Sequence, residues 1–187
     1  MKKFILLILT CEVLFSAPNM KDTIVNKALE VQHKLHDVIS KNVKSKISQD
    51  GIYTAAEFCA KESYKKIEEL NKTLDENISV KRVSLRNRNQ DSYPQDDEKK
   101  ILEAFELIEK SNAYLPSEIV QLNEDGEYKV YFPSTMSSKN CKSCHGAIEG
   151  VNKEVYELFK SKYPNDKAFD FSSGEVRGAV IVTVKQK

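Results

Sequence analysis

Apolar side chains recur at helical spacing along the N-terminal part of the chain. Between about residues 20 and 48 they follow one another at steps of three and four, which indicates an amphipathic helix. Gly51 interrupts this pattern, and a second apolar stripe predicts another helix over residues 52–74. Cys59 belongs to the second stripe, so we expect its side chain on the buried face of that helix.

The pattern changes after this helical pair. Segments rich in β-branched residues predict strands, and Tyr128, Val130 and Phe132 alternate with polar residues behind an Asp-Gly turn, as in a hairpin. The sequence therefore predicts an α+β domain that follows an N-terminal helical pair. The expected strands cover residues 78–85, 128–132 and 176–184, and the further helices cover about 96–110 and 152–162.

The first residues have the pattern of a secretory signal peptide. Lys2 and Lys3 make the start basic, two short apolar runs follow up to Phe15, and Ser16-Ala17 offers small residues for cleavage. We therefore expect residues 1–17 to be a signal peptide and residues 20–187 to form one domain.

Two further expectations follow from this signal peptide. Its apolar run is too short to span a bilayer, so we expect no integral membrane segment after cleavage and a periplasmic location. Lipidation of Cys11 is an alternative, although Thr10 before it is bulkier than such sites usually accept.

Composition narrows the function classes. The chain has 187 residues, of which 40% are apolar and 30% charged, as in a folded domain. Loss of Lys2, Lys3 and Glu12 with the leader leaves equal numbers of basic and acidic residues, so net charge does not support nucleic-acid binding. Loss of Cys11 leaves three cysteines, an odd number that disulfide pairing alone does not explain in an exported protein.

Two of these cysteines stand in the motif Cys141-Lys142-Ser143-Cys144-His145, the signature of covalent haem c attachment. Cysteines three residues apart reach the two vinyl groups of a porphyrin, and the histidine that follows is placed beneath the iron. The motif predicts one haem c, held by thioethers from Cys141 and Cys144 and ligated by His145. A Cys141–Cys144 disulfide or a structural zinc site fits less well, because redox motifs lack this histidine and no second Cys or His pair has ligand spacing.

The second axial ligand stays open at this level. Cys59 is one candidate, and the others are His33, His36, Met136 and a position left to water. Arginines are the natural partners of haem propionates, and we expect Arg88 and Arg177 in this role, with Arg86 as a weaker candidate.

Taken together, four segments resemble the PAS-like c-type haem domain family typified by a cyanobacterial cytochrome. Related domains serve as haem sensor inputs of histidine kinases and chemoreceptors. The resemblance implies a PAS-like antiparallel sheet with flanking helices, and it implies that Cys59 and His145 are the two axial ligands of the iron. The segments are Ala55–Cys59, Val83–Pro94, Cys141–Gly146 and Tyr163–Ala179.

The resulting expectation is an exported, single-haem c-type cytochrome for redox sensing or electron transfer. A thiolate ligand favours ferric iron, so the potential is expected to be low. The expected partner is a separate redox or signalling protein, because no kinase or receptor segment accompanies the domain, and the first helix offers a surface for a homodimer. The alternative is a haem enzyme of peroxidase or nitrogen-oxide reductase type, which needs an open distal site.

Overall fold

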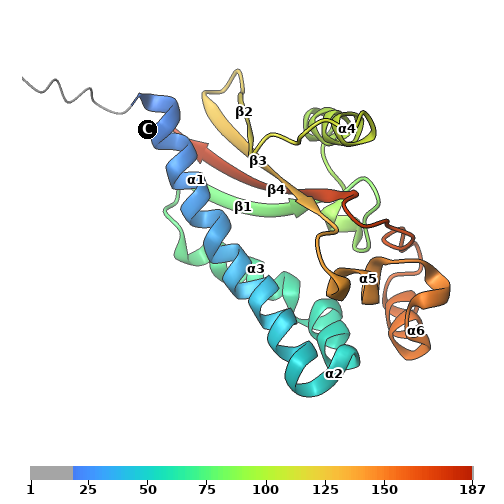
Figure 1. Cartoon of the computed structure of the whole chain (residues 1–187). Coiled ribbons are helices and arrows are strands. Elements are labelled where there is room, and N and C mark those ends of the chain that lie inside the picture. The colour runs from blue at the N-terminus through green and yellow to red at the C-terminus, as the bar shows by residue number, and fades with distance from the viewer. Residues whose placement is uncertain (1–18, 187) are drawn as a thin grey trace, which may run out of the picture.

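The computed structural model describes residues 19–186 as a four-stranded antiparallel sheet with helices packed along it (Figure 1). The N-terminal part contains α1 (Met20–His36), a π-helical turn (Asp37–Lys41), α2 (Asn42–Lys61), α3 (Ser63–Thr73), β1 (Ile78–Val83), a short turn (Gln90–Ser92) and α4 (Asp96–Lys110). The C-terminal part contains β2 (Ile119–Leu122), β3 (Glu127–Thr135), α5 (Lys139–His145), a short turn (Ile148–Gly150), α6 (Lys153–Lys162) and β4 (Val176–Lys185).

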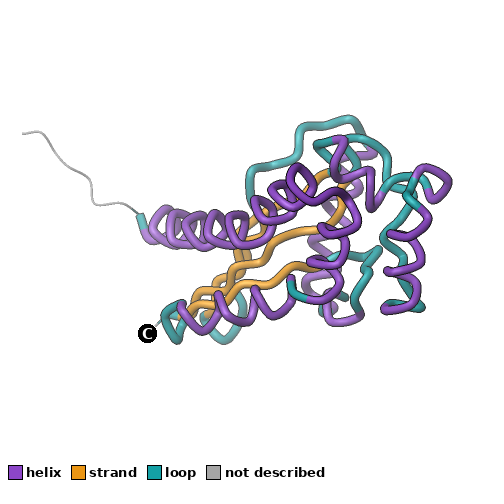
Figure 2. The backbone as a smooth tube through the Cα atoms, turned by 90° about the horizontal axis from the view of Figure 1, so that it is seen from below, coloured by secondary structure: helices purple, strands orange, loops and turns teal. Residues whose placement is uncertain are grey.

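The last strand, β4, occupies the interior of the sheet, whose order is β1-β4-β3-β2. It pairs with β1 from Ile78 opposite Val184 to Val83 opposite Ala179, and with β3 along its other edge. Its alternating valines point to one face, as expected from the sequence. In Figure 2 the strands form one layer that the helices flank.

Each face of the sheet has its own hydrophobic core. On one face, Val80, Val130 and Val182 pack with Leu35 of α1 and Ile67 of α3. On the other face, Tyr131 and Ile181 pack with Leu102 and Phe105 of α4, all nearly inaccessible to solvent. This arrangement confirms the predicted α+β fold, with its antiparallel sheet, flanking helices and N-terminal helical pair.

Gly51 breaks the helical pair as expected. It has φ 86 and ψ 173, which are not helical values, so two helical segments meet at a kink within α2. A second break, which the sequence did not indicate, comes at Glu62 and separates α2 from α3. The Ser63 hydroxyl donates to the Cys59 carbonyl (2.7 Å), a local bond that competes with continuous helix. The sequence pattern missed this boundary because the apolar stripe continues across it.

Three further elements differ. Strand β1 ends at Val83, two residues earlier than expected, and β2 is an edge strand that the sequence pattern did not indicate. The cysteine motif, where the sequence pattern did not indicate a helix, forms the short helix α5, because the Ser138 side chain accepts the Cys141 backbone N–H at its start. The expected signal peptide lies outside the described residues. Within residues 19–186, no helix combines the length and apolar character needed to cross a bilayer.

Candidate functional site

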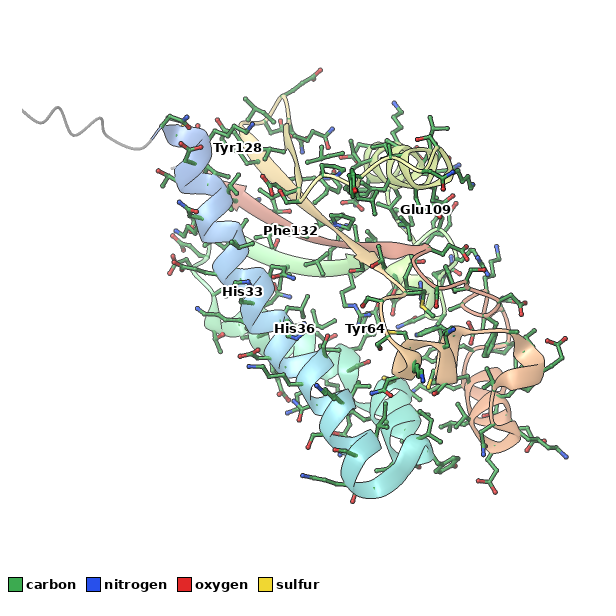
Figure 3. All side chains as sticks on the ribbon, viewed as in Figure 1. His33, His36, Tyr64, Glu109, Tyr128 and Phe132 are labelled. Carbon is green, nitrogen blue, oxygen red and sulfur yellow. The ribbon has the colours of Figure 1, made fainter. Side chains whose placement is uncertain are left out.

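The chain forms a cavity where the N-terminal helices meet one end of the sheet and helix α5. Cys59 of α2 and His145 of α5 both line it, although they are far apart in the sequence. Tyr64 of α3 is another lining residue, and Figure 3 shows it between the N-terminal helices and α5. The cavity therefore brings together the histidine of the motif and the cysteine of the second helix.

Helix α5 holds the two cysteines of the motif one turn apart. Cys141 packs beside Met136, Ala168 and Phe171, whereas Cys144 packs against the cluster formed by α2 and α6. Both are free thiols, as is Cys59. Burial raises the pKa of the Cys144 thiol to about 12, so it is protonated at neutral pH in the absence of a covalent partner.

A glycine closes the motif for a steric reason. The Gly146 N–H donates to the Lys142 carbonyl (2.9 Å) and ends α5. A Cβ at this position would come within 2.7 Å of the same carbonyl oxygen. The chain therefore turns directly after His145, at a position where a side chain would not fit.

The imidazole of His145 is held in one orientation. Its Nδ1 lies 2.8 Å from the Ala168 carbonyl oxygen, and because a carbonyl only accepts, Nδ1 carries the proton. Burial lowers the pKa of His145 well below its usual value, and the charges of Arg177 and Arg88 add to this effect. The ring is therefore neutral, with Nε2 deprotonated, which is the form that binds a metal ion.

Cys59 has a partly buried side chain next to the packed surface between α2 and α6. Burial raises the pKa of its thiol, while the positive charges of Arg82 and Arg88 act in the opposite direction. When the sulfur of such a thiol binds a metal ion, the metal ion replaces the proton and the sulfur becomes a thiolate.

Arg177 is a buried cation whose hydrogen bonding is incomplete. One terminal nitrogen donates to the Ser84 hydroxyl (2.6 Å) and to the Arg86 carbonyl (3.1 Å). Its Nε is buried and has no hydrogen-bond partner. Burial, with the charges of Arg82 and Arg88, lowers the pKa of Arg177 to about 9.

The cavity carries an excess of positive charge. Arg82, Arg88 and Arg177 all line it, and within the described part of the chain neither Arg82 nor Arg177 forms an ion pair with a carboxylate. Arg82 was not singled out from the sequence, where it looks like one more surface cation on a strand. The arrangement suits a ligand that brings carboxylates of its own.

Arg88 is engaged with the motif itself. Its Nε donates to the Asp166 carboxylate (2.7 Å), and a terminal nitrogen donates to the Cys144 carbonyl (2.8 Å). Its guanidinium lies 3.4 Å from the ring centre of Phe159. Arg86 instead pairs with Glu175 (2.7 Å) and is not a lining residue.

The other candidate ligands lie elsewhere. His33 and His36 are exposed on α1 (Figure 3), and Met136 is buried beside Phe171. None of these three side chains lines the cavity. Of the candidates weighed from the sequence, the structure brings only Cys59 into the same cavity as His145.

The donor set fits an iron porphyrin. The His145 imidazole, with its Nε2 deprotonated, and the Cys59 thiol line the same cavity. The two thiols of the attachment motif lie beside this cavity. Arginines also line it, and the buried Nε of Arg177 has no hydrogen-bond partner, so a carboxylate could bind there. A porphyrin with two propionates would use all three features. Imidazole nitrogen and cysteine sulfur are each known ligands of haem iron.

Comparison with known proteins places the chain in a family. Among solved structures, the fold is similar to the "crystal structure of the cyanobacterial heme-protein Tll0287", with a TM-score of 0.66 and 21% sequence identity over 91% of this chain and 98% of that chain. No curated protein matches the chain. The family model described as Tll0287-like matches residues 15–185. The resemblance noted in the sequence is thereby confirmed, and the chain belongs to the Tll0287-like family.

Proposed function

We propose that this protein is an exported c-type haem protein in which one haem is attached to Cys141 and Cys144 and ligated by His145 and Cys59. The observation that carries the proposal is the convergence of His145 and Cys59, from distant helices, on one cavity beside the attachment motif. The match to a family whose similar solved structure is named a haem protein supports it.

The arginines support the same proposal. A haem has two propionates, and the cavity offers an unpartnered Arg177 Nε together with Arg82. Charge-assisted hydrogen bonds between guanidinium and carboxylate are among the stronger polar contacts in proteins. Arg88 contributes positive charge as well, although two of its nitrogens are already bound to Asp166 and to the Cys144 carbonyl.

The residues around the cavity support a redox role. A bound haem supplies a one-electron change of its iron. Cys59 donates electron density through sulfur and favours the ferric state, so we expect a low potential and a partner protein that exchanges electrons or reads the redox state. A haem enzyme needs an acid or base above an open coordination position, whereas Cys59 stands in the cavity and His33 and His36 lie on the exposed side of α1.

The test is the visible spectrum of protein produced together with a c-type haem maturation system. We expect a Soret band, haem that stays with the polypeptide after denaturation, and a low-spin ferric spectrum. The variant Cys59→Ala should keep the covalent haem but become largely high-spin. The control Met136→Leu, a volume-conserving change in the core, should keep the wild-type spectrum.

Two results would contradict the proposal. A chain that acquires no Soret band under these conditions is not a c-type haem protein. A Cys59→Ala spectrum identical to that of the wild type would leave covalent attachment standing but exclude Cys59 as the axial ligand.

A further inference from the structure

Asp166 stands in a closed ring of contacts that includes His145. Its Oδ1 accepts the Ala168 N–H (2.8 Å), and the Ala168 carbonyl accepts the proton on His145 Nδ1 (2.8 Å). Its Oδ2 accepts Arg88 Nε (2.7 Å), and Arg88 donates to the carbonyl of Cys144, the residue before the histidine (2.8 Å). The ring of contacts therefore returns to the backbone at His145.

This ring is deeply buried. The Asp166 side chain is inaccessible to solvent and that of Arg88 is 10% exposed. Phe159 and Phe169 face the Arg88 guanidinium, with ring centres 3.4 and 4.9 Å away. Contacts that are fully enclosed in this way hold their geometry better than exposed ones, because water does not compete for the same donors and acceptors.

We propose that Asp166 and Arg88 are positioning residues that set the orientation and tautomer of the His145 ring. Asp166 fixes the backbone two residues onward and so places the Ala168 carbonyl, which in turn keeps the proton on Nδ1. Arg88 joins this loop to the C-terminal end of α5. The effect on a bound iron rests on the proposed function, but the effect on the orientation and tautomer of the His145 imidazole does not.

The first test uses haem-free protein. Nitrogen-15 NMR of the histidine ring should show the Nδ1-protonated tautomer of His145 in the wild type. The variant Asp166→Asn removes the ion pair with Arg88 and should give a mixture of the two tautomers. Should this variant fold poorly, Arg88→Lys keeps the positive charge but cannot bridge Asp166 and the Cys144 carbonyl at once, so the same mixture is expected.

The second test uses haem-loaded protein. Loss of the Asp166 charge leaves the positive charge of Arg88 uncompensated and holds the His145 imidazole less firmly. Both effects disfavour ferric iron. We expect the ferric-to-ferrous equilibrium to shift at least tenfold toward ferrous, which for a one-electron couple raises the midpoint potential by about 59 mV. The g values of the low-spin ferric signal should change as well, which a loss of global stability alone does not cause.

The matched control is Asp97→Asn. Asp97 pairs with Lys129 at the same distance (2.7 Å), and the Lys129 side chain is also 10% exposed, but the pair lies at α4 and makes no contact with the cavity. In Asp97→Asn, the His145 tautomer, the haem midpoint potential and the g values should equal those of the wild type. A wild-type tautomer and unchanged potential in Asp166→Asn would overturn the inference. Absence of haem in the wild type would overturn the proposed function, while the NMR test would still decide the positioning role.

Discussion

Removal of the Arg177 charge should have opposite effects on the haem-free and the haem-loaded protein. In the structure the guanidinium is buried, its Nε has no hydrogen-bond partner, and no carboxylate among the described residues forms an ion pair with it. The substitution Arg177→Gln removes the charge and keeps an amide that can still donate to the Ser84 hydroxyl.

The magnitude follows from the fall in the pKa of Arg177 from 12.5 to about 9, caused first by burial and then by Arg82 and Arg88. At about 1.4 kcal/mol per pKa unit, the charged form is disfavoured by roughly 5 kcal/mol at most. Loss of the bond to the Arg86 carbonyl offsets about 1.5–3 kcal/mol of this. The haem-free variant should therefore be more stable than the wild type, by about 2 kcal/mol.

The haem-loaded variant should behave in the opposite way. On the proposed function, a haem propionate beside Arg177 would neutralise the charge, so Arg177→Gln would then lose a charge-assisted hydrogen bond of about 1.5–3 kcal/mol. Urea unfolding of the two forms measures both numbers. The control Arg86→Gln removes a cation that already has a carboxylate partner, Glu175, and should destabilise both forms. Equal destabilisation of haem-free protein by Arg177→Gln and Arg86→Gln would refute the reasoning.

Two further predictions concern parts of the fold outside the cavity. Gly51→Ala should destabilise the protein by about 1–3 kcal/mol in urea unfolding, because φ 86 and ψ 173 are strained for alanine, although its Cβ would meet no atom within 4 Å. An unchanged midpoint would mean that the kink relaxes. The pKa of Asp97 is lowered from 3.8, chiefly by its hydrogen bond to Lys129, so its contribution is present at neutral pH and is lost as the pH falls through and below 3.8. Asp97→Asn should therefore lower the free energy of unfolding by about 0.5–1 kcal/mol at pH 7, since a solvent-screened pair is worth little more. It should also reduce the loss of stability as the pH falls below about 4. A wild-type acid dependence in this variant would show that the pair contributes nothing.

The parts of the fold that the sequence predicted well are those with a long, regular apolar period. Helix α1 buries one face along its length, and this burial appears in the sequence as a helical repeat of apolar residues. Strand β4 is buried on both faces, so its apolar residues form an almost continuous run. Strand β2 has four residues, all at least partly exposed at the edge of the sheet, so no alternation marks it. Helix α5 has no apolar stripe at all, and its formation depends on the Ser138 cap and on packing from other elements.

The site was predictable to a similar degree. The motif identified His145 without knowledge of the fold, because its spacing encodes a chemical requirement. The expectation of propionate contacts treated Arg88 and Arg177 alike, yet the structure gives them different surroundings. Arg88 is bound to Asp166, which lies far along the chain, and Arg177 lacks a carboxylate. Such differences arise from tertiary contacts, and no local pattern records them.

Cys59 owes its place beside His145 to the residues around it on α2. Ala56 and Ala60 are almost fully buried against Val155 and Phe159 of α6, in a cluster that Cys59 and Cys144 both contact. Side chains as small as alanine let two helices approach closely, so this face of α2 brings the Cys59 sulfur toward α5 without any specific bond. A haem ligated by Cys59 and His145 would therefore join two helices that the apolar core has already brought together. On this view the core supplies the distance between the ligands, whereas the ring of contacts through Asp166 supplies the direction of the imidazole.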